Sequence, residues 1–255
     1  MGRPFKNKML DNGLNGRFAV IIPVYNHQQK VREVVLACKK LLIPIFVIDD
    51  GSTDGSYDRI KEIEDICILR HRINRGKGAA ILTGMQAAGA TTDWAITLDA
   101  DGQHNPADAF KLIRAIPSQK IQSGQRPIIV GKRQGMVGAE IPWTSRYGRK
   151  FSNFWVWLSG GPLMDDSQSG FRIYPLPETL DLNVTARRFQ FEVEVLVKAR
   201  WNMIPVYETP VSVNYRPGVK RISHFRPFID FVRNTGVFTR LIFKRVVFPN
   251  SMRLK

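Results

Sequence analysis

Residues 94–106 read WAITLDADGQHNP, an apolar run that ends in two aspartates one residue apart. Side chains alternate along a strand, so Asp99 and Asp101 would point the same way and Ala100 the other. Carboxylates held that close raise each other's pKa unless a positive group lies between them. Converging carboxylates suit hard cations such as Mg²⁺ or Mn²⁺, so the stretch predicts a cation site at the end of a buried strand.

Similar apolar runs recur along the chain, each separated from the next by a loop or a helical pattern. The expected strands lie at 18–24, 43–48, 66–71, 94–99, 128–133, 171–174 and within 204–215. The expected helices lie at 28–42, 56–63, 79–88, 108–116, 145–160 and 189–200, and 117–127 is expected to be a polar loop. Apolar strands that alternate with helices form a parallel sheet covered on both faces. We therefore predict one α/β domain with a mostly parallel central sheet.

Polar loops follow three of these strands, at the sheet edge where open α/β sheets bind ligands. In DDGSTD, the adjacent Asp49 and Asp50 need hydrogen-bond donors, which ribose hydroxyls or base N–H groups would supply. Asp54 in the same loop could simply cap the next helix. In NRGKG, Arg75 and Lys77 precede a helix, an arrangement that suits a phosphate or a neighbouring carboxylate.

Positive charge is concentrated near the end of the chain. The formal net charge is +16, and residues 213–255 contain ten Lys or Arg against one acid. Such an excess suits nucleic acid, phosphate-rich small molecules or an anionic lipid surface. A pure binding surface has no use for a converging acidic cluster, so we expect no nucleic-acid partner. Residues 225–248 predict a helix with a wide apolar face and a narrow basic stripe, which would lie on a membrane or pack on the domain, and the membrane is slightly favoured.

Cysteine content and hydropathy bear on the compartment. Cys38 and Cys67 are the only cysteines, and they are better explained as reduced core residues than as a disulfide. The N-terminal segment lacks the apolar region of a signal peptide, and no run of about 18 apolar residues occurs. We expect a cytoplasmic protein that could bind a membrane peripherally, with an extension at 1–16, a main domain at 17–224 and a basic amphipathic tail at 225–255.

The motifs occur in a recognisable order. IIPVYN, VIDDGSTDGS, NRGKGAA, TLDADGQHNP, DDSQSGFRIY, FEVEVLVKA and SHFRPFIDF together resemble the family 2 glycosyltransferases, in the branch of dolichyl- and polyprenyl-phosphate mannose and glucose synthases. The resemblance covers about residues 17–235. It implies a GT-A fold, a GDP- or UDP-hexose donor, Mg²⁺ or Mn²⁺, and inversion at the anomeric carbon. Members of this branch often carry transmembrane helices, which this sequence lacks, so a soluble acceptor stays open.

The resemblance also implies roles for matching positions. It places contacts to the nucleotide sugar at Pro23, Tyr25, Asn26, Asp49, Asp50, Asp54, Lys77, Asp99 and Ala100. It places the metal on Asp99, Asp101 and Gln168, with Asp101 the surest ligand. A cation that bridges the donor's phosphates would stabilise charge on the leaving group. The implied catalytic set is Asp101, Asp166, Gln168 and Arg172.

The nature of the acceptor decides which further groups are needed. A phosphate monoester already carries an anionic oxygen and needs positive groups, whereas a hydroxyl needs a base, for which Asp166 is best placed. The expected acceptor contacts are Arg146, Arg149, Arg172, Ser169, Arg221 and His224, with Arg187 and Arg188 behind them. Glu192 and Glu194 are either acids on a helix face or catalytic groups. His104 is either a loop-packing residue, which we favour, or a further contact.

These observations favour transfer of a hexose from a GDP- or UDP-sugar to a lipid-linked phosphate at the cytoplasmic face of a membrane. One alternative is transfer to a hydroxyl of a glycan or glycolipid. Another is a non-catalytic basic protein that binds a membrane or nucleic acid on the same scaffold. The intact DAD and DDGSTD motifs argue against this second alternative.

Overall fold

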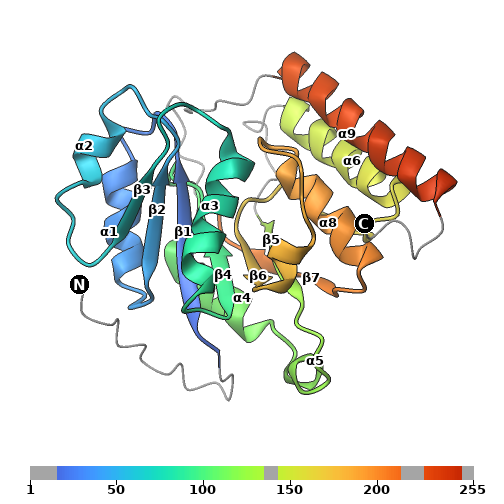
Figure 1. The fold of residues 1–255 in the computed structure, drawn as a ribbon, viewed down its shortest axis with the longest axis horizontal. Helices are drawn as coiled ribbons and strands as arrows, with labels where there is room; N and C mark the ends of the chain where they lie inside the picture. Colours follow the sequence, from blue (N-terminus) through green and yellow to red (C-terminus); the bar gives the residue numbers. More distant parts are fainter. Residues whose placement is uncertain (1–15, 135–142, 214–226, 249–255) are drawn as a thin grey trace.

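A seven-stranded sheet forms the centre of the molecule (Figure 1). The computed structural model describes residues 16–134, 143–213 and 227–248. The strands are β1 Phe18–Val24, β2 Ile45–Asp49, β3 Cys67–Arg70, β4 Trp94–Thr97, β5 Ile128–Arg133, β6 Arg172–Pro175 and β7 Val206–Val211, in the order β3-β2-β1-β4-β6-β5-β7. β6 runs antiparallel to β4 and β5, and the other neighbouring strands run parallel. The predicted mostly parallel α/β sheet is confirmed.

Helices cover both faces of this sheet. One face carries α1 Val31–Lys39, α2 Ser56–Ile60 and α4 Ala109–Arg114, which follows the 3₁₀ turn η1 Pro106–Asp108. The other face carries α3 Lys77–Gly89, α7 Glu178–Asp181 and α8 Phe191–Trp201. α6 Trp143–Leu158 and α9 Pro227–Val247 lie side by side beyond α8 (Figure 1). The short helix α5 Ser118–Gln122 precedes β5.

The alternation of side chains in β1 explains why two cores form. All seven residues of β1 are buried. Phe18, Val20 and Ile22 pack into the core under α1 and α4, while Ala19 and Ile21 pack into the core under α3 and α8. Because successive side chains of a strand point to opposite faces, one apolar run supplies both cores.

The order of the strands places a ligand site beside β1. The chain moves outward from β1 to β2 and β3, and then returns to β4 on the other side of β1. Connections therefore leave β1 and β4 in opposite directions. Such a switch opens a crevice beyond the carboxyl ends of the two strands, where open α/β sheets bind their ligands.

The helical layer furthest from β3 is fixed by both apolar and ionic contacts. Phe238 and Leu241 of α9 are buried, and the Phe238 ring stacks on Trp155 of α6 with centroids 6.0 Å apart. Arg240 of α9 lies 3.0 Å from the carboxylate of Glu194, a buried residue of α8. One face of the predicted C-terminal helix therefore packs on the domain.

Two expectations about local structure are settled by the described residues. The prediction of a polar loop over 117–127 is wrong for 118–122, which form α5. That segment has helix-forming residues after Pro117 but no apolar stripe to reveal them. Cys38 and Cys67 are both free, as expected. None of the helices in the described ranges combines the length and hydropathy needed to span a bilayer.

Candidate active site

Asp49 ends β2 and holds the loop that follows it. Its Oδ1 accepts a hydrogen bond from Ser52 N at 2.9 Å, and its Oδ2 lies 2.9 Å from Arg70 Nε. Gly51 between them has φ of 73°, and a Cβ there would lie 2.6 Å from the carbonyl carbon of Ile73. A glycine is needed because this conformation and this close approach both exclude a side chain. Asp49 therefore supports the loop after β2.

Asp50 is saturated by donors from the neighbouring loop. Its buried carboxylate accepts hydrogen bonds from Arg75 N at 2.9 Å, Gly76 N at 2.7 Å and His71 Nδ1 at 2.6 Å. The other ring nitrogen of His71 lies 3.0 Å from Thr83 Oγ1. This arrangement differs from the expected contact of Asp50 with ribose or base. Because the two backbone N–H groups at the turn into α3 need an acceptor in the interior, Asp50 is used to shape that turn.

The loops after β1 and β2 are joined by side chains at their tips. Asn26 Oδ1 accepts from Thr53 N at 2.8 Å. Asp54 accepts from Gln28 N and from Ser56 N, both at 2.9 Å. Burial alone would raise the pKa of Asp54, but hydrogen bonds from Ser56 and Gln28 outweigh it and hold the pKa below its ordinary value. Asp54 therefore supports the loop and the start of α2 as an ionised group.

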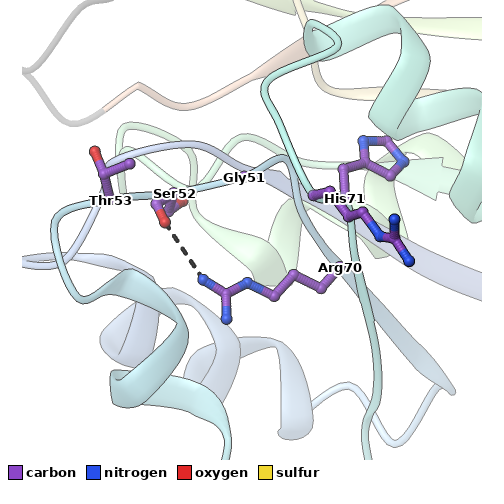
Figure 2. A pocket seen from close by; sticks show the side chains of 6 residues that line it. Gly51, Ser52, Thr53, Arg70 and His71 are labelled. Carbon is purple, nitrogen blue, oxygen red and sulfur yellow. Dashed lines mark hydrogen bonds between the residues drawn. The ribbon is translucent and has the colours of Figure 1, made fainter.

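A cavity of about 450 Å³ opens beside these loops (Figure 2). Arg70 reaches across it, with Nη2 3.5 Å from Ser52 O and its guanidinium 4.5 Å from the centre of the Tyr57 ring. Pro23 lies near the end of the adjacent strand β1, where it pairs with Ile48, and the half-buried Tyr25 comes directly after the last residue of that strand, Val24. The cavity is lined by Gly51, Ser52, Thr53, Arg70, His71 and Arg72.

Asp99 and Asp101 lie just beyond β4, above the core that receives Ala100. The Asp101 carboxylate accepts from Gln103 N at 3.0 Å. Burial and the negative charge of Asp99 together raise the pKa of Asp101 above its ordinary value. Burial also opposes ionisation of Asp99, but the charge of Lys77 outweighs it and keeps the pKa of Asp99 low. The two carboxylates therefore repel each other as the sequence predicts, and among the described residues only Asp99 forms an ion pair.

That cation is Lys77, the first residue of α3. Its Nζ lies 2.7 Å from Asp99 Oδ1 and 2.6 Å from Glu192 Oε1 of α8. Burial disfavours its charge, but Asp99 and Glu192 more than compensate, so the pKa of Lys77 lies above its ordinary value. The ammonium group is thus a permanent charge in the acidic site.

The donor set at this position fits a divalent cation. Asp99 already faces a positive group, whereas Asp101 forms no ion pair with the part of the chain that the structure describes and has a pKa raised by burial and by Asp99. Within the described ranges, three or more His, Cys, Asp or Glu side chains nowhere gather into a metal-binding group. Further oxygens would therefore have to come from a residue such as Gln168 and from the substrate. The loop that carries Gln168 lies against Asp99, since a Cβ on Gly170 would be 2.6 Å from Asp99 Oδ2, and Thr97 Oγ1 donates to Gly170 O at 2.7 Å.

Arg172 holds the loop that carries Gln168 through hydrogen bonds to its backbone. The side chain is fully buried, and its guanidinium donates to Ser169 O at 2.6 Å, Ser167 O at 2.7 Å and Glu192 O at 2.7 Å. This geometry differs from the expected contact of Arg172 with an acceptor phosphate, because the guanidinium donates its hydrogen bonds to three backbone carbonyl groups. Ser169, another expected acceptor contact, is buried, and its Oγ has no hydrogen-bond partner among the described residues.

Asp166 is held as the partner of an arginine. Its Oδ2 accepts from Arg133 Nε at 2.7 Å and its Oδ1 from Arg133 Nη2 at 2.8 Å. Glu208 of β7 accepts from Asp166 N at 2.8 Å. Burial would raise the pKa of Asp166, but Arg133 outweighs it and lowers the pKa. A carboxylate stabilised in this way is a weak proton acceptor, which disfavours the expected role of Asp166 as a general base.

The structure describes only some of the expected acceptor contacts. Arg221 and His224 lie outside the described residues, as does the side chain of Arg146, whose backbone belongs to α6. Arg149 is half-buried, and its charge helps to lower the pKa of Asp166. Arg188 is exposed and donates to Asn74 Oδ1 at 3.2 Å, next to the NRGKG turn.

The two glutamates of α8 have different surroundings. Glu192 contacts Lys77 in the acidic site, whereas Glu194 contacts Lys198 and Arg240 and binds the helical layer. His104 is buried, with its ring centroid 5.2 Å from that of Phe171, in line with the packing interpretation. Burial lowers its pKa.

Sequence reasoning missed four groups that shape the site: Arg70, His71, Arg133 and Glu208. Three of them follow or end strands β3 and β5, where the polar residues of LRHR and GKR mark the same edge of the sheet. That signal was available. Glu208 lies inside β7 and offers no comparable signal.

Comparison with known proteins identifies the family. The profile of glycosyl transferase family 2 matches residues 19–174. The chain belongs to glycosyl transferase family 2. This glycosyltransferase is 30% identical to the UDP-N-acetylglucosamine–dolichyl-phosphate N-acetylglucosaminyltransferase of Methanococcus voltae, over 77% of this chain and 85% of that one. It is 28% identical to the polyprenol monophosphomannose synthase of Mycolicibacterium smegmatis, over 88% and 89%. The resemblance to the polyprenyl-phosphate branch is confirmed.

Solved structures show the same fold. The glucosyl-3-phosphoglycerate synthase of Mycobacterium tuberculosis, in complex with Mn²⁺, UDP and phosphoglyceric acid, gives a TM-score of 0.65 at 16% identity, covering 92% of this chain and 80% of that one. Its complex with Mg²⁺ and UDP also gives 0.65 at 16% identity, with 92% and 81% covered. This glycosyltransferase therefore has the predicted GT-A fold.

Proposed function

We propose that this glycosyltransferase transfers a hexose from a nucleotide-diphosphate sugar to a polyprenyl phosphate, with inversion at the anomeric carbon. The observation that carries the proposal is the Asp99 and Asp101 pair beside the switch between β1 and β4, in which Asp99 contacts Lys77. The cavity of about 450 Å³ at the ends of β2 and β3 has the volume of a small-molecule site, and we assign it to the nucleoside. The acidic pair then receives the diphosphate with its cation.

In the proposed reaction, an oxygen of the acceptor phosphate attacks the anomeric carbon as the bond to the donor diphosphate breaks. Attack from the side opposite the leaving group inverts the carbon. A divalent cation on Asp99, Asp101 and Gln168 would supply stabilisation of the charge on the leaving diphosphate. Asp99 is kept ionised by Lys77, so it can bind a cation at neutral pH.

A phosphate acceptor is favoured over a hydroxyl by the state of Asp166. A hydroxyl must lose a proton to a base, and Asp166 is engaged by Arg133 with a lowered pKa. A phosphate monoester is already anionic and needs only positive groups to position it. Arg188 and Arg75, both exposed beside the turn that begins α3, are suitable positive groups. The names of the two relatives, which include dolichyl phosphate and polyprenol, support the same choice.

The acceptor is tested by incubating the full chain with Mn²⁺ or Mg²⁺, polyprenyl phosphate and a panel of radiolabelled UDP- and GDP-hexoses. We expect label in the organic extract with one donor of the panel, which also identifies the base and sugar. Glycan and glycolipid acceptors are assayed in parallel. Transfer to these hydroxyl acceptors alone would establish the rival function.

We also propose that the enzyme binds the cytoplasmic face of an anionic membrane through α6 and α9. Large apolar side chains that are half or more exposed gather on these helices and the loop after α6: Phe154, Trp157, Leu163, Phe243, Val246 and Val247. Figure 1 shows both helices together on the side of the molecule away from α1 and α2. Lys150, Arg240, Lys244 and Arg245 place positive charge on the same helices. Aromatic side chains beside basic ones suit the head-group region of an anionic bilayer.

Vesicle flotation tests the membrane face. The double variant Trp157→Glu/Phe243→Glu should bind phosphatidylglycerol-containing vesicles at least about tenfold more weakly than the wild type, because two apolar anchors become anionic. Leu36→Glu, an exposed apolar position on α1, is the matched control and should bind normally. Equal binding by wild type and double variant would show that this face does not contact the bilayer.

A further inference from the structure

Lys77 occupies an enclosed position between two acids. Its side chain is 15% exposed, and its Nζ lies 2.7 Å from Asp99 and 2.6 Å from Glu192. A Cβ on Gly170 would lie 2.6 Å both from Lys77 Nζ and from Asp99 Oδ2. The backbone of the Gln168 loop therefore closes over the ion pair. The absence of a side chain at Gly170 is what makes room for the ammonium group.

We propose that Lys77 is the internal counter-cation of Asp99, and that the donor's diphosphate draws it away so that a divalent cation gains full access to Asp99. This rests on the proposed function of the site. An ammonium and a divalent cation on the same carboxylate repel each other strongly in a poorly solvated place. A cation that arrives alone must displace Lys77, and among the described residues the other anion in contact with Lys77 is Glu192.

A nucleotide diphosphate changes this competition. It provides an anion for Lys77 at the start of α3, where a helix N-terminus and the turn at Gly76 also favour negative charge. Cation and nucleotide then bind cooperatively. Because coupling between two ligands is reciprocal, the nucleotide raises cation affinity by the same factor as the cation raises nucleotide affinity.

Mn²⁺ binding to the full chain, followed by electron paramagnetic resonance, tests the coupling without any transfer reaction. Wild-type protein should bind Mn²⁺ alone weakly and at least about tenfold more tightly with UDP or GDP. The double variant Lys77→Met/Glu192→Gln removes the internal cation together with its second partner, so that no unpaired glutamate is left behind. It should bind Mn²⁺ alone at least about tenfold more tightly than the wild type.

The controls separate this effect from loss of structure. Lys39→Met removes a surface lysine that contacts Asp65 and should leave Mn²⁺ binding unchanged. Circular dichroism checks that the double variant is folded. Lys77→Met alone is a second variant, which should also bind Mn²⁺ more tightly than the wild type. Folded variants that bind Mn²⁺ no more tightly than the wild type would overturn the proposal, as would equal wild-type affinity with and without nucleotide. If Mn²⁺ and nucleotide bind cooperatively but no label is transferred to polyprenyl phosphate, only the proposed acceptor is contradicted.

Discussion

Two pairs of aspartates lie at the carboxyl ends of β2 and β4, the buried strands on either side of β1, and their surroundings differ. Asp49 and Asp50 are buried, and backbone N–H groups, His71 and Arg70 surround their carboxylates. The pair in the DAD motif is half-buried. Asp99 pairs with Lys77, whereas the pKa of Asp101 is raised above its ordinary value. A carboxylate satisfied by the protein shapes a loop, whereas a carboxylate left short of positive charge can still bind a ligand.

The contrast follows from what surrounds each pair. The first pair faces a turn whose backbone N–H groups would be unsatisfied without it. The second pair lies beside Lys77 and beside the loop closed by Gly170. Both motifs look alike as sequence, so composition alone does not separate structural acids from functional ones. The hydrogen-bond donors and cations around each pair distinguish the two roles.

The largest expected effect comes from removing the satisfied carboxylate. Asp50→Ala leaves Arg75 N, Gly76 N and His71 Nδ1 without their acceptor. Losing the partner of buried donors costs about 1–3 kcal/mol for each group, and we expect the free energy of unfolding to fall by about 3 kcal/mol or more. Urea denaturation measures it. Asp58→Ala, on the exposed side of α2, is the control and should leave the midpoint unchanged. A stable Asp50→Ala protein would remove the distinction between the pairs.

A smaller effect is expected when the closed loop is crowded. Gly170→Ala places a Cβ 2.6 Å from both Asp99 Oδ2 and Lys77 Nζ. We expect a loss of about 1–3 kcal/mol in stability from overpacking. We also expect transfer to fall about 100-fold, because the acidic pair is displaced.

The matched control for this variant lies in α9. A Cβ on Gly236 would meet no atom within 4 Å, so Gly236→Ala should gain about 0.5–1 kcal/mol from helix propensity and keep full activity. Full activity in Gly170→Ala would show that the loop tolerates a side chain and that Lys77 and Asp99 are less confined than the distances indicate.

The smallest expected effect is a difference in pH dependence. Burial and Asp99 raise the pKa of Asp101 in the folded state, so stability falls as pH rises from the unfolded value through the folded one. Asp101→Asn removes the ionisable group that causes this loss of stability. The variant should therefore stabilise the metal-free protein more at pH 7 than at pH 4. Asp54 has a lowered pKa, so Asp54→Asn should destabilise the protein, and more at pH 7 than at pH 4. Thermal unfolding in EDTA measures both variants. A change in unfolding temperature of the same sign for Asp101→Asn and Asp54→Asn would contradict the account.

Much of the fold could be predicted because it depends on local pattern. The buried strands are apolar runs such as FAVIIPV, and the polar loops that end them gather at one edge because the sheet is mostly parallel. Pro227 marks the start of α9, as expected of a residue suited to the first helical turn. The antiparallel direction of β6 and the short helix α5 could not be read from such patterns, since neither changes the apolar periodicity.

The site was predictable in its position but not in its connections. The DAD motif and the NRGKG turn are visible as sequence, yet the ion pair of Lys77 with Glu192 joins residues 115 positions apart. The pairing of Asp166 with Arg133 and the burial of Arg172 arise in the same way, from strands that are neighbours only in the folded sheet. Motifs therefore locate the chemistry, while the partners that decide which acid is free come from tertiary structure.

Transfer of labelled hexose to polyprenyl phosphate by Asp101→Asn tests the central claim most directly. Asparagine keeps the shape of the side chain but removes the charge that the DAD pair contributes. We expect a folded protein whose transfer rate falls at least about 100-fold, the loss typical of removing a preorganised electrostatic group. Asp54→Asn, which alters a loop-supporting carboxylate, should lose less than about tenfold in the same assay. Undiminished transfer by Asp101→Asn would contradict the assignment of the chemistry to this pair.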